Sequence, residues 1–346
     1  MKRKIRSVFF GLTAASASLV MFISWTGKLP ASTAKEIEAS ALKSFSLLQL
    51  SSAVFTGKAR CASCHHSTMT AMVARALEQK GIAANDTTAQ MREGSMVATL
   101  DIVCNPNLNN QFVTAKFLAP YELLGLDAEK HPADFTTDIA VDYIMSQALP
   151  DGSFKAEYWR VPLEAGDIHL TALSVRAVQL FASPAKSAKL QQMILRSKEW
   201  IEAQHPVLQQ ELSFQLLGMH WCGSSQSTMK AVAQKLLGLQ NKDGGWSQLP
   251  TMQSDAYATG QVLYALSQSG LAIIEDPAYQ IGIAWLLRTQ DKTGAWIVKT
   301  RSNPIQPFVN SDFPPYDDNQ FISAAATNWA TLALVDALPD KNEKQK

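Results

Sequence analysis

The sequence has almost no net charge, and its body has no strongly basic or acidic block. Its 31 Lys and Arg residues nearly balance 30 Asp and Glu residues, which gives a formal net charge of +1. Proteins that bind nucleic acid usually carry a basic patch or stripe, so we expect no nucleic-acid partner. Charged residues also cluster at the very end of the chain, where we predict a polar tail over residues 339–346.

The sequence also lacks the signals of a β-sheet. No stretch alternates polar and apolar residues for long, and none has the signature of a hairpin. Apolar residues recur instead at helical spacing, as at Ile37, Ala41, Phe45 and Leu48. We therefore expect an all-α protein with a sizeable core. Helices are predicted over residues 36–50, 67–77, 87–103, 112–126, 137–147, 170–181, 189–203, 208–219, 229–239, 258–266, 279–288 and 323–334.

The N-terminus has the pattern of an export signal. Four basic residues precede an apolar run over residues 8–25, and small residues at Ser32 and Ala34 have the spacing that a signal peptidase accepts. We interpret residues 1–34 as a signal peptide, or as an uncleaved N-terminal anchor, because the run approaches membrane-spanning length. Either reading places the body outside the cytoplasm, in the periplasm or an equivalent compartment. Membrane association is expected only if the segment is not cleaved.

One turn is repeated along the chain. At residues 240–246 an apolar helix ends, an Asp-Gly-Gly turn follows, and Trp246 comes directly after it. The same spacing recurs at residues 290–296 with Trp296, and once more, with one extra residue, before Phe154. Each turn leads to a helix of small apolar residues that contains a threonine. Self-similarity of this kind indicates a repeat architecture, here six helical hairpins.

These Gln-x-x-Asp-Gly-x-Trp turns resemble those of the terpenoid cyclase and protein prenyltransferase superfamily, which includes the squalene cyclases. The resemblance implies a single (α/α)6 toroid, which we place at residues 35–338. In such a toroid six parallel inner helices are enclosed by six antiparallel outer helices. The class II cyclases of this family use an Asp-x-Asp-Asp acid motif. Here Asp317 and Asp318 follow Pro315 instead, so the acid motif is absent.

A ring of parallel inner helices gathers their N-termini on one rim, where their partial positive charges favour an anion. The residues four before the aligned threonines should lie there: His66, Asn110, Asp167, Asp255 and Ser323. Asp, Asn and Ser are ordinary helix caps, and His is not. Asp255 lies at a rim comparable to that of the zinc-binding Asp in prenyltransferases, although Tyr257 stands where their Cys would be.

The sharpest local motif is Cys61-x-x-Cys64-His65, which has the pattern of c-type haem attachment. We predict a cofactor site there, with haem c as the first interpretation. A zinc site is the alternative, formed by the two cysteines with His65, His66 or both, and a further ligand from the ring such as Asp255. A third interpretation is that Cys61 and Cys64 form a disulfide or are free thiols without a function. His169, Met69 and Met72 are candidates for a sixth iron ligand.

Two loops rich in aromatic, charged or proline residues precede inner helices and are predicted to overhang the same rim. Long loops of this kind in a compact domain are often functional. Two function classes follow. One is a cofactor-bearing protein for redox chemistry or sensing, and the other binds an apolar isoprenoid or lipid in the central cavity. The rim and pocket candidates are Trp159, Arg160, Asp167, His169, Arg301, Gln306, Phe313, Asp318 and Gln320.

Overall fold

The computed structural model describes residues 31–104, 115–157, 160–271, 274–303 and 310–340. Over these residues the chain forms twelve α-helices, a π-helix and a 3-10 helix, and no strand. The one β feature among them is an isolated bridge between Arg160 and Glu164. The predicted all-α class is therefore confirmed. The predicted export segment lies almost wholly outside the described residues, and no described helix is long and apolar enough to cross a membrane.

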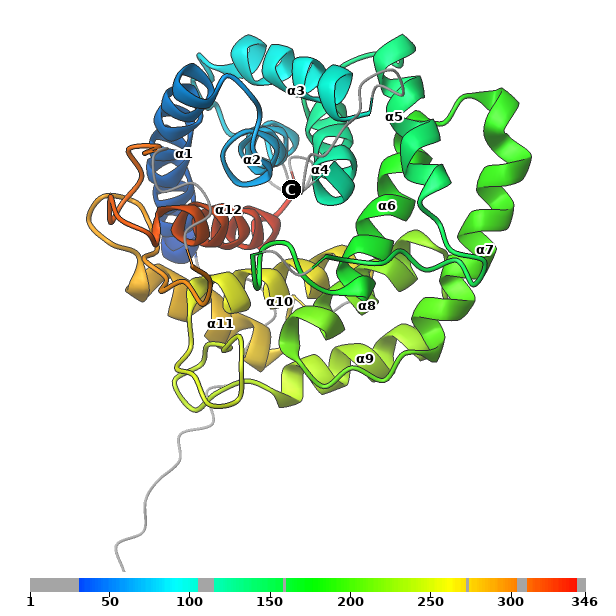
Figure 1. Ribbon diagram of the computed structural model, residues 1–346. Coiled ribbons are helices and arrows are strands. Elements are labelled where there is room, and N and C mark those ends of the chain that lie inside the picture. The colour runs from blue at the N-terminus through cyan, green and yellow to red at the C-terminus, as the bar shows by residue number, and fades with distance from the viewer. Residues whose placement is uncertain (1–30, 105–114, 158–159, 272–273, 304–309, 341–346) are drawn as a thin grey trace, which may run out of the picture.

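The helices form two concentric rings (Figure 1). Each inner helix packs against the next inner helix, and the last packs against the first, which closes the ring. The outer helices are α1 (Ala31–Ala59), α3 (Ala89–Val103), α5 (Phe135–Ser146), α7 (Ser187–Ala203), α9 (Gln226–Gly238) and α11 (Pro277–Thr289). The inner helices are α2 (Met69–Gln79), α4 (Ala115–Ala128), α6 (Asp167–Phe181), α8 (Gln209–Trp221), α10 (Ala256–Gln268) and α12 (Gln320–Asp336).

Burial follows this division. Nearly every residue of α12 is buried, whereas α7 buries only Met193, Ser197 and Ile201. Inner helices are surrounded by other helices, so they carry small and apolar residues on all sides, while outer helices keep one polar face. Alternation along the chain makes the inner helices run in the same direction. Their N-termini therefore share one end of the ring, as the sequence predicts.

The repeated turn joins an outer helix to the inner helix that follows it. Trp246 is fully buried, its indole Nε1 donates to the Leu236 carbonyl of α9, and its backbone N–H donates to the Thr259 hydroxyl of α10. Trp296 repeats both bonds with Leu286 and Thr327. The predicted position of these aromatics between outer and inner helices is confirmed. The aligned threonine has a structural role in both repeats, because its hydroxyl accepts a hydrogen bond from the backbone N–H of the turn's tryptophan.

Some predicted helix starts are wrong. Helix α6 begins at Asp167 with Gly166 before it, and α12 begins at Gln320, three positions before Ser323. Neither Asp167 nor Ser323 therefore caps its helix. The Ser323 hydroxyl instead accepts from the Val298 backbone N–H at 3.0 Å. No side chain caps either of these two helices, so capping residues in the sequence do not mark where the helices begin.

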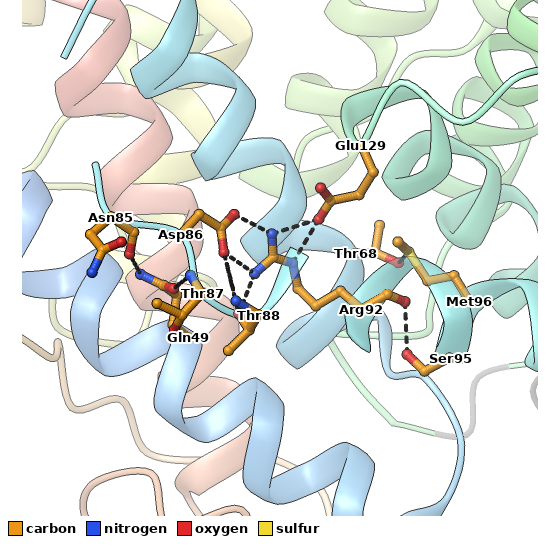
Figure 2. A network of polar contacts seen from close by, with 10 residues as sticks. All are labelled: Gln49, Thr68, Asn85, Asp86, Thr87, Thr88, Arg92, Ser95, Met96 and Glu129. Carbon is orange, nitrogen blue, oxygen red and sulfur yellow. Dashed lines mark hydrogen bonds and ion pairs between the residues drawn. The ribbon is translucent and has the colours of Figure 1, made fainter. Parts of the chain in front are cut away.

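A buried arginine ties the first helices together (Figure 2). The Arg92 side chain is fully buried on α3, and it forms ion pairs with Asp86 and with Glu129, which follows α4. Its Nε donates to Glu129 at 2.8 Å, and Nη1 donates to the Thr88 hydroxyl at 2.6 Å. A buried charge with this many partners is well compensated, which identifies the cluster as structural.

Candidate metal site at the mouth of the inner ring

The motif Cys64-His65 lies in a π-helix, η1 (Cys64–Thr68), which continues directly into α2. Ser63 precedes this turn, and its hydroxyl accepts from the His65 backbone N–H at 3.3 Å. Asn328 of α12 donates its side-chain amide to the His65 carbonyl at 2.8 Å. Single π-turns are rare and are frequent at functional sites. The motif therefore sits at the N-terminal end of the inner ring, held by residues on both sides.

Cys64 and His65 lie beside Glu164, which comes from the loop before α6. One ligand atom from each residue, a sulfur, an imidazole nitrogen and a carboxylate oxygen, lies within 4.8 Å of the other two. The three residues are only 2%, 3% and 3% exposed. His65 Nε2 and Glu164 Oε2 have no hydrogen-bond partner. Buried polar atoms are nearly always paired, so an unpaired atom on each of two neighbouring buried residues requires an explanation.

A short hairpin positions Glu164. Its backbone N–H donates to the Arg160 carbonyl at 2.8 Å, and the Arg160 guanidinium lies 3.5 Å from its carboxylate. Gln210 of α8 fixes the far side of the hairpin by donating to the Pro162 and Ala165 carbonyls at 3.0 and 3.1 Å. The loop is thereby anchored over the mouth of the ring, with the carboxylate directed at Cys64 and His65.

Burial sets the protonation states of the group. It raises the pKa of Cys64 well above its ordinary value, and nearby Glu164 and Glu122 add to the rise. Burial also raises the pKa of Glu164, against the pull of Arg160. For His65, burial and the charge of Arg160 lower the pKa. Each group is thus driven towards its neutral form, and a bound cation would reverse this for the thiol and the carboxylate.

The other residues of the predicted cofactor motif lie apart from this group. Cys61 is partly exposed and is not among the close donors. His66 is buried with both ring nitrogens occupied, Nε2 by the Ser311 hydroxyl at 2.9 Å and Nδ1 by the Ser63 hydroxyl at 3.3 Å. Its ring also stacks on Phe55. These contacts leave His66 no free nitrogen for a ligand.

Asp255 and His169 have structural partners. Asp255 caps α10 by accepting from the Ala258 backbone N–H at 2.9 Å, and its second oxygen accepts from Gln248. His169 pairs its ring nitrogens with the Tyr121 hydroxyl and the Ala165 carbonyl, at 3.1 and 3.2 Å. Burial lowers the pKa of His169 to about 3, so the ring is neutral.

The remaining rim candidates do not gather at one point. Asp167 accepts from the Ala156 backbone N–H and pairs with Lys155. Arg301 donates to Gln248 at 2.8 Å, and Phe313 is fully buried. Asp318 is exposed, and Gln320 accepts from Ser311 at 2.7 Å. Trp159 and Gln306 lie outside the described residues.

One buried carboxyl group was not predicted from the sequence. Glu122 of α4 is fully buried beneath the π-helix, where one oxygen accepts from the Thr68 hydroxyl at 2.9 Å and the other has no partner. Burial raises its pKa to about 8, so it is mostly protonated at neutral pH. The available signal was a single acidic residue within the apolar run over residues 117–126.

Comparison with known proteins identifies the fold and goes no further. No protein-family model matches the sequence, and no characterised protein matches it in sequence. Among solved structures, the type II terpene cyclase MstE from Scytonema matches with a TM-score of 0.55 and 13% identity, over 88% of this chain and 99% of that one. A variant of MstE in complex with its substrate, geranylgeranyl dihydroxybenzoate, matches with a TM-score of 0.54 and 14% identity, over 88% of this chain and 98% of that one. The predicted toroid is confirmed.

Proposed function

We propose that this protein is a zinc protein in which Cys64, His65 and Glu164 hold the ion at the mouth of the toroid. The observation that carries the proposal is the close group of three buried residues with metal-ligand atoms, two of which also have a buried polar atom without a hydrogen-bond partner. Three protein ligands leave one of zinc's four positions open, as in catalytic zinc sites. A ligand or a water molecule would take that position, and the ion would polarise it.

The donor set favours zinc over harder cations. Calcium and magnesium prefer oxygen ligands, whereas thiolate with imidazole suits zinc. Binding requires the Cys64 thiol to lose its proton, so metal affinity should rise with pH and binding should release protons. Asn328, which holds the His65 backbone, supplies the kind of surrounding support that fixes a ligand's orientation.

Haem c at Cys61, Cys64 and His65 is the second candidate for this site, and the sequence motif is its support. Thioether attachment requires both thiols and the imidazole to face one opening that admits the macrocycle. Cys64 and His65 are buried in the packed interior, and Cys61 is not among the close donors. This arrangement suits a single ion better than a haem. An absorption spectrum separates the two, because a zinc protein is colourless.

Binding of an apolar ligand is a separate candidate function, favoured by aromatic rings inside the inner ring. Phe214 of α8 stacks on His169 of α6 at 3.8 Å and also meets Trp329 of α12, which is not its neighbour in the ring. These contacts cross the interior, so a ligand bound there would have to displace these rings or lie against them. MstE, the structural relative, was solved with an isoprenoid substrate. If this chain binds such a molecule, organic extraction of the purified protein should release a lipid.

We also propose that the protein is exported, on the pattern of residues 1–34. The mature chain then begins near Lys35, or it remains anchored by residues 8–25. N-terminal sequencing of protein from its native cell decides between these forms. A full-length soluble product in the cytoplasm would contradict both.

Metal analysis of the purified protein tests the zinc proposal. We expect about one zinc ion per chain, and at least about tenfold weaker zinc binding in C64S. The matched control is C222S, which alters another buried free cysteine at the end of α8 and should keep its zinc. Full zinc content in C64S, or none in the wild type, would contradict the proposal.

A further inference from the structure

Arg160 places a positive charge beside the proposed metal site without a full set of partners. Its side chain is 15% exposed, its Nε is buried with no hydrogen-bond partner, and its contact with Glu164 is long, at 3.5 Å. The other buried arginine, Arg92, contrasts with it, since Arg92 pairs with two carboxylates and a hydroxyl.

The charges of the proposed metal site indicate that an anion is missing beside Arg160. A zinc ion with the Cys64 thiolate and the Glu164 carboxylate forms a neutral centre, and that centre already uses the carboxylate nearest Arg160. The Arg160 charge would then be buried without compensation, which is costly unless an anion accompanies it.

We propose that the open zinc position and the Arg160 guanidinium together bind a carboxylate group of the protein's ligand. This inference rests on the proposed zinc function and assigns its ligand class. One oxygen of the carboxylate would take the open coordination position, and the other would accept from the guanidinium. A carboxylate carries the single charge that the site lacks, and its two oxygens match the guanidinium fork.

The hairpin that carries Arg160 suits this role. Arg160 and Glu164 form an antiparallel bridge, and residues directly opposite each other in such a pair extend to the same side. Two side chains hold the turn between them: the Ser302 hydroxyl donates to the Val161 carbonyl at 2.7 Å, and the Gln210 amide donates to the Pro162 carbonyl at 3.0 Å. The anchored hairpin thus directs a metal ligand and a cation to one point.

Acetate titration of the cobalt-loaded protein tests the proposal. Cobalt(II) replaces zinc in such sites, and its visible spectrum changes when an anion takes the open position. We expect a saturable spectral change with acetate in the wild type. At saturating cobalt, R160M should need about tenfold to a hundredfold more acetate than the wild type, because it loses charge-assisted hydrogen bonds. The control R75M removes an exposed arginine and should match the wild type.

The outcomes separate the two levels of the proposal. If the wild type binds neither cobalt nor zinc, the zinc function fails and the carboxylate site falls with it. If cobalt binds but R160M needs no more acetate than the wild type, only the carboxylate site is overturned. Tighter binding of methyl phosphate than of acetate, or equal binding of neutral acetamide, would also overturn it. If R160M does not fold, R160K takes its place. At saturating cobalt, R160K should bind acetate more weakly than the wild type, and an unchanged acetate affinity would refute the proposal.

Discussion

At the scale of single residues, the interior separates satisfied polar groups from unsatisfied ones. Arg92, His66 and His169 have partners for their buried nitrogens, and each of them serves packing. His65 and Glu164, which each have an unpaired buried atom, lie together at the mouth of the ring. The sequence motif predicted Cys64 and His65. It did not pair them with Glu164, because a contact between residues from two distant loops exists only after folding.

Glu122 gives a prediction at this scale. Its pKa is about 8 in the folded protein, against an ordinary value of 4.5, so the folded state holds a proton that the unfolded state releases. Its contribution to stability is therefore complete below pH 4.5 and is lost as pH rises through 8. Relative to E122Q, the wild type should lose about 1.4 kcal/mol of unfolding free energy per pH unit between these limits.

Denaturant unfolding at several pH values measures this difference. Comparison with E122Q is needed because the buried histidines have the opposite effect. Burial lowers the pKa values of His66 and His169, so their contribution to the stability of the protein is lost as the solution becomes acidic. Glutamine can still accept from the Thr68 hydroxyl. The surface variant E78Q serves as a control, with the wild-type slope expected above neutral pH. A difference between wild type and E122Q that does not change with pH would show that Glu122 ionises normally.

At the scale of elements, the repeated turn is the unit that the sequence predicts best. Asp-Gly followed by an aromatic is a local signal, and Gly244 adopts a φ of 92° that few other residues accept. The twelve helices followed from apolar periodicity for the same reason. The π-helix at Cys64 was not predicted, because one extra residue in a turn leaves the apolar pattern nearly unchanged.

Trp246→Ala should destabilise the protein by about 3–5 kcal/mol, because the indole is fully buried and its cavity between α9 and α10 would remain. Thr259→Val removes only the hydroxyl that accepts from the Trp246 N–H, and we expect a loss of about 1–3 kcal/mol. Equilibrium unfolding in denaturant measures both. Leu195→Ala, at an exposed position, should change stability by less than about 0.5 kcal/mol. A Trp246→Ala effect as small as that control would refute the structural role of the turn.

At the scale of the whole molecule, closure of the ring makes the last helix part of the same core as the first. Helix α12 packs against α10, α1 and α2 (Figure 1). The repeats differ in length along the sequence, which favoured a closed ring over an open array. They did not show that Asn328 of α12 would support His65.

Deletion of residues 320–346 should abolish cooperative unfolding altogether, because it removes α12, opens the inner ring and exposes the buried faces of α2 and α10. An open repeat array would instead tolerate loss of its terminal helix and melt at a somewhat lower temperature. Thermal unfolding followed by circular dichroism distinguishes these results. Deletion of residues 341–346 alone, the last part of the predicted tail over residues 339–346, is the control and should leave the transition intact.

X-ray absorption spectroscopy at the zinc edge is the sharpest test of the metal site, because it reports which atoms surround the ion. We expect one sulfur ligand at about 2.3 Å, with nitrogen and oxygen ligands at about 2.0–2.2 Å. The sulfur is assigned to Cys64, and Cys61 contributes none. Two sulfur ligands, a protein without zinc, or a haem absorption spectrum in place of a zinc signal would contradict the site proposed at Cys64, His65 and Glu164.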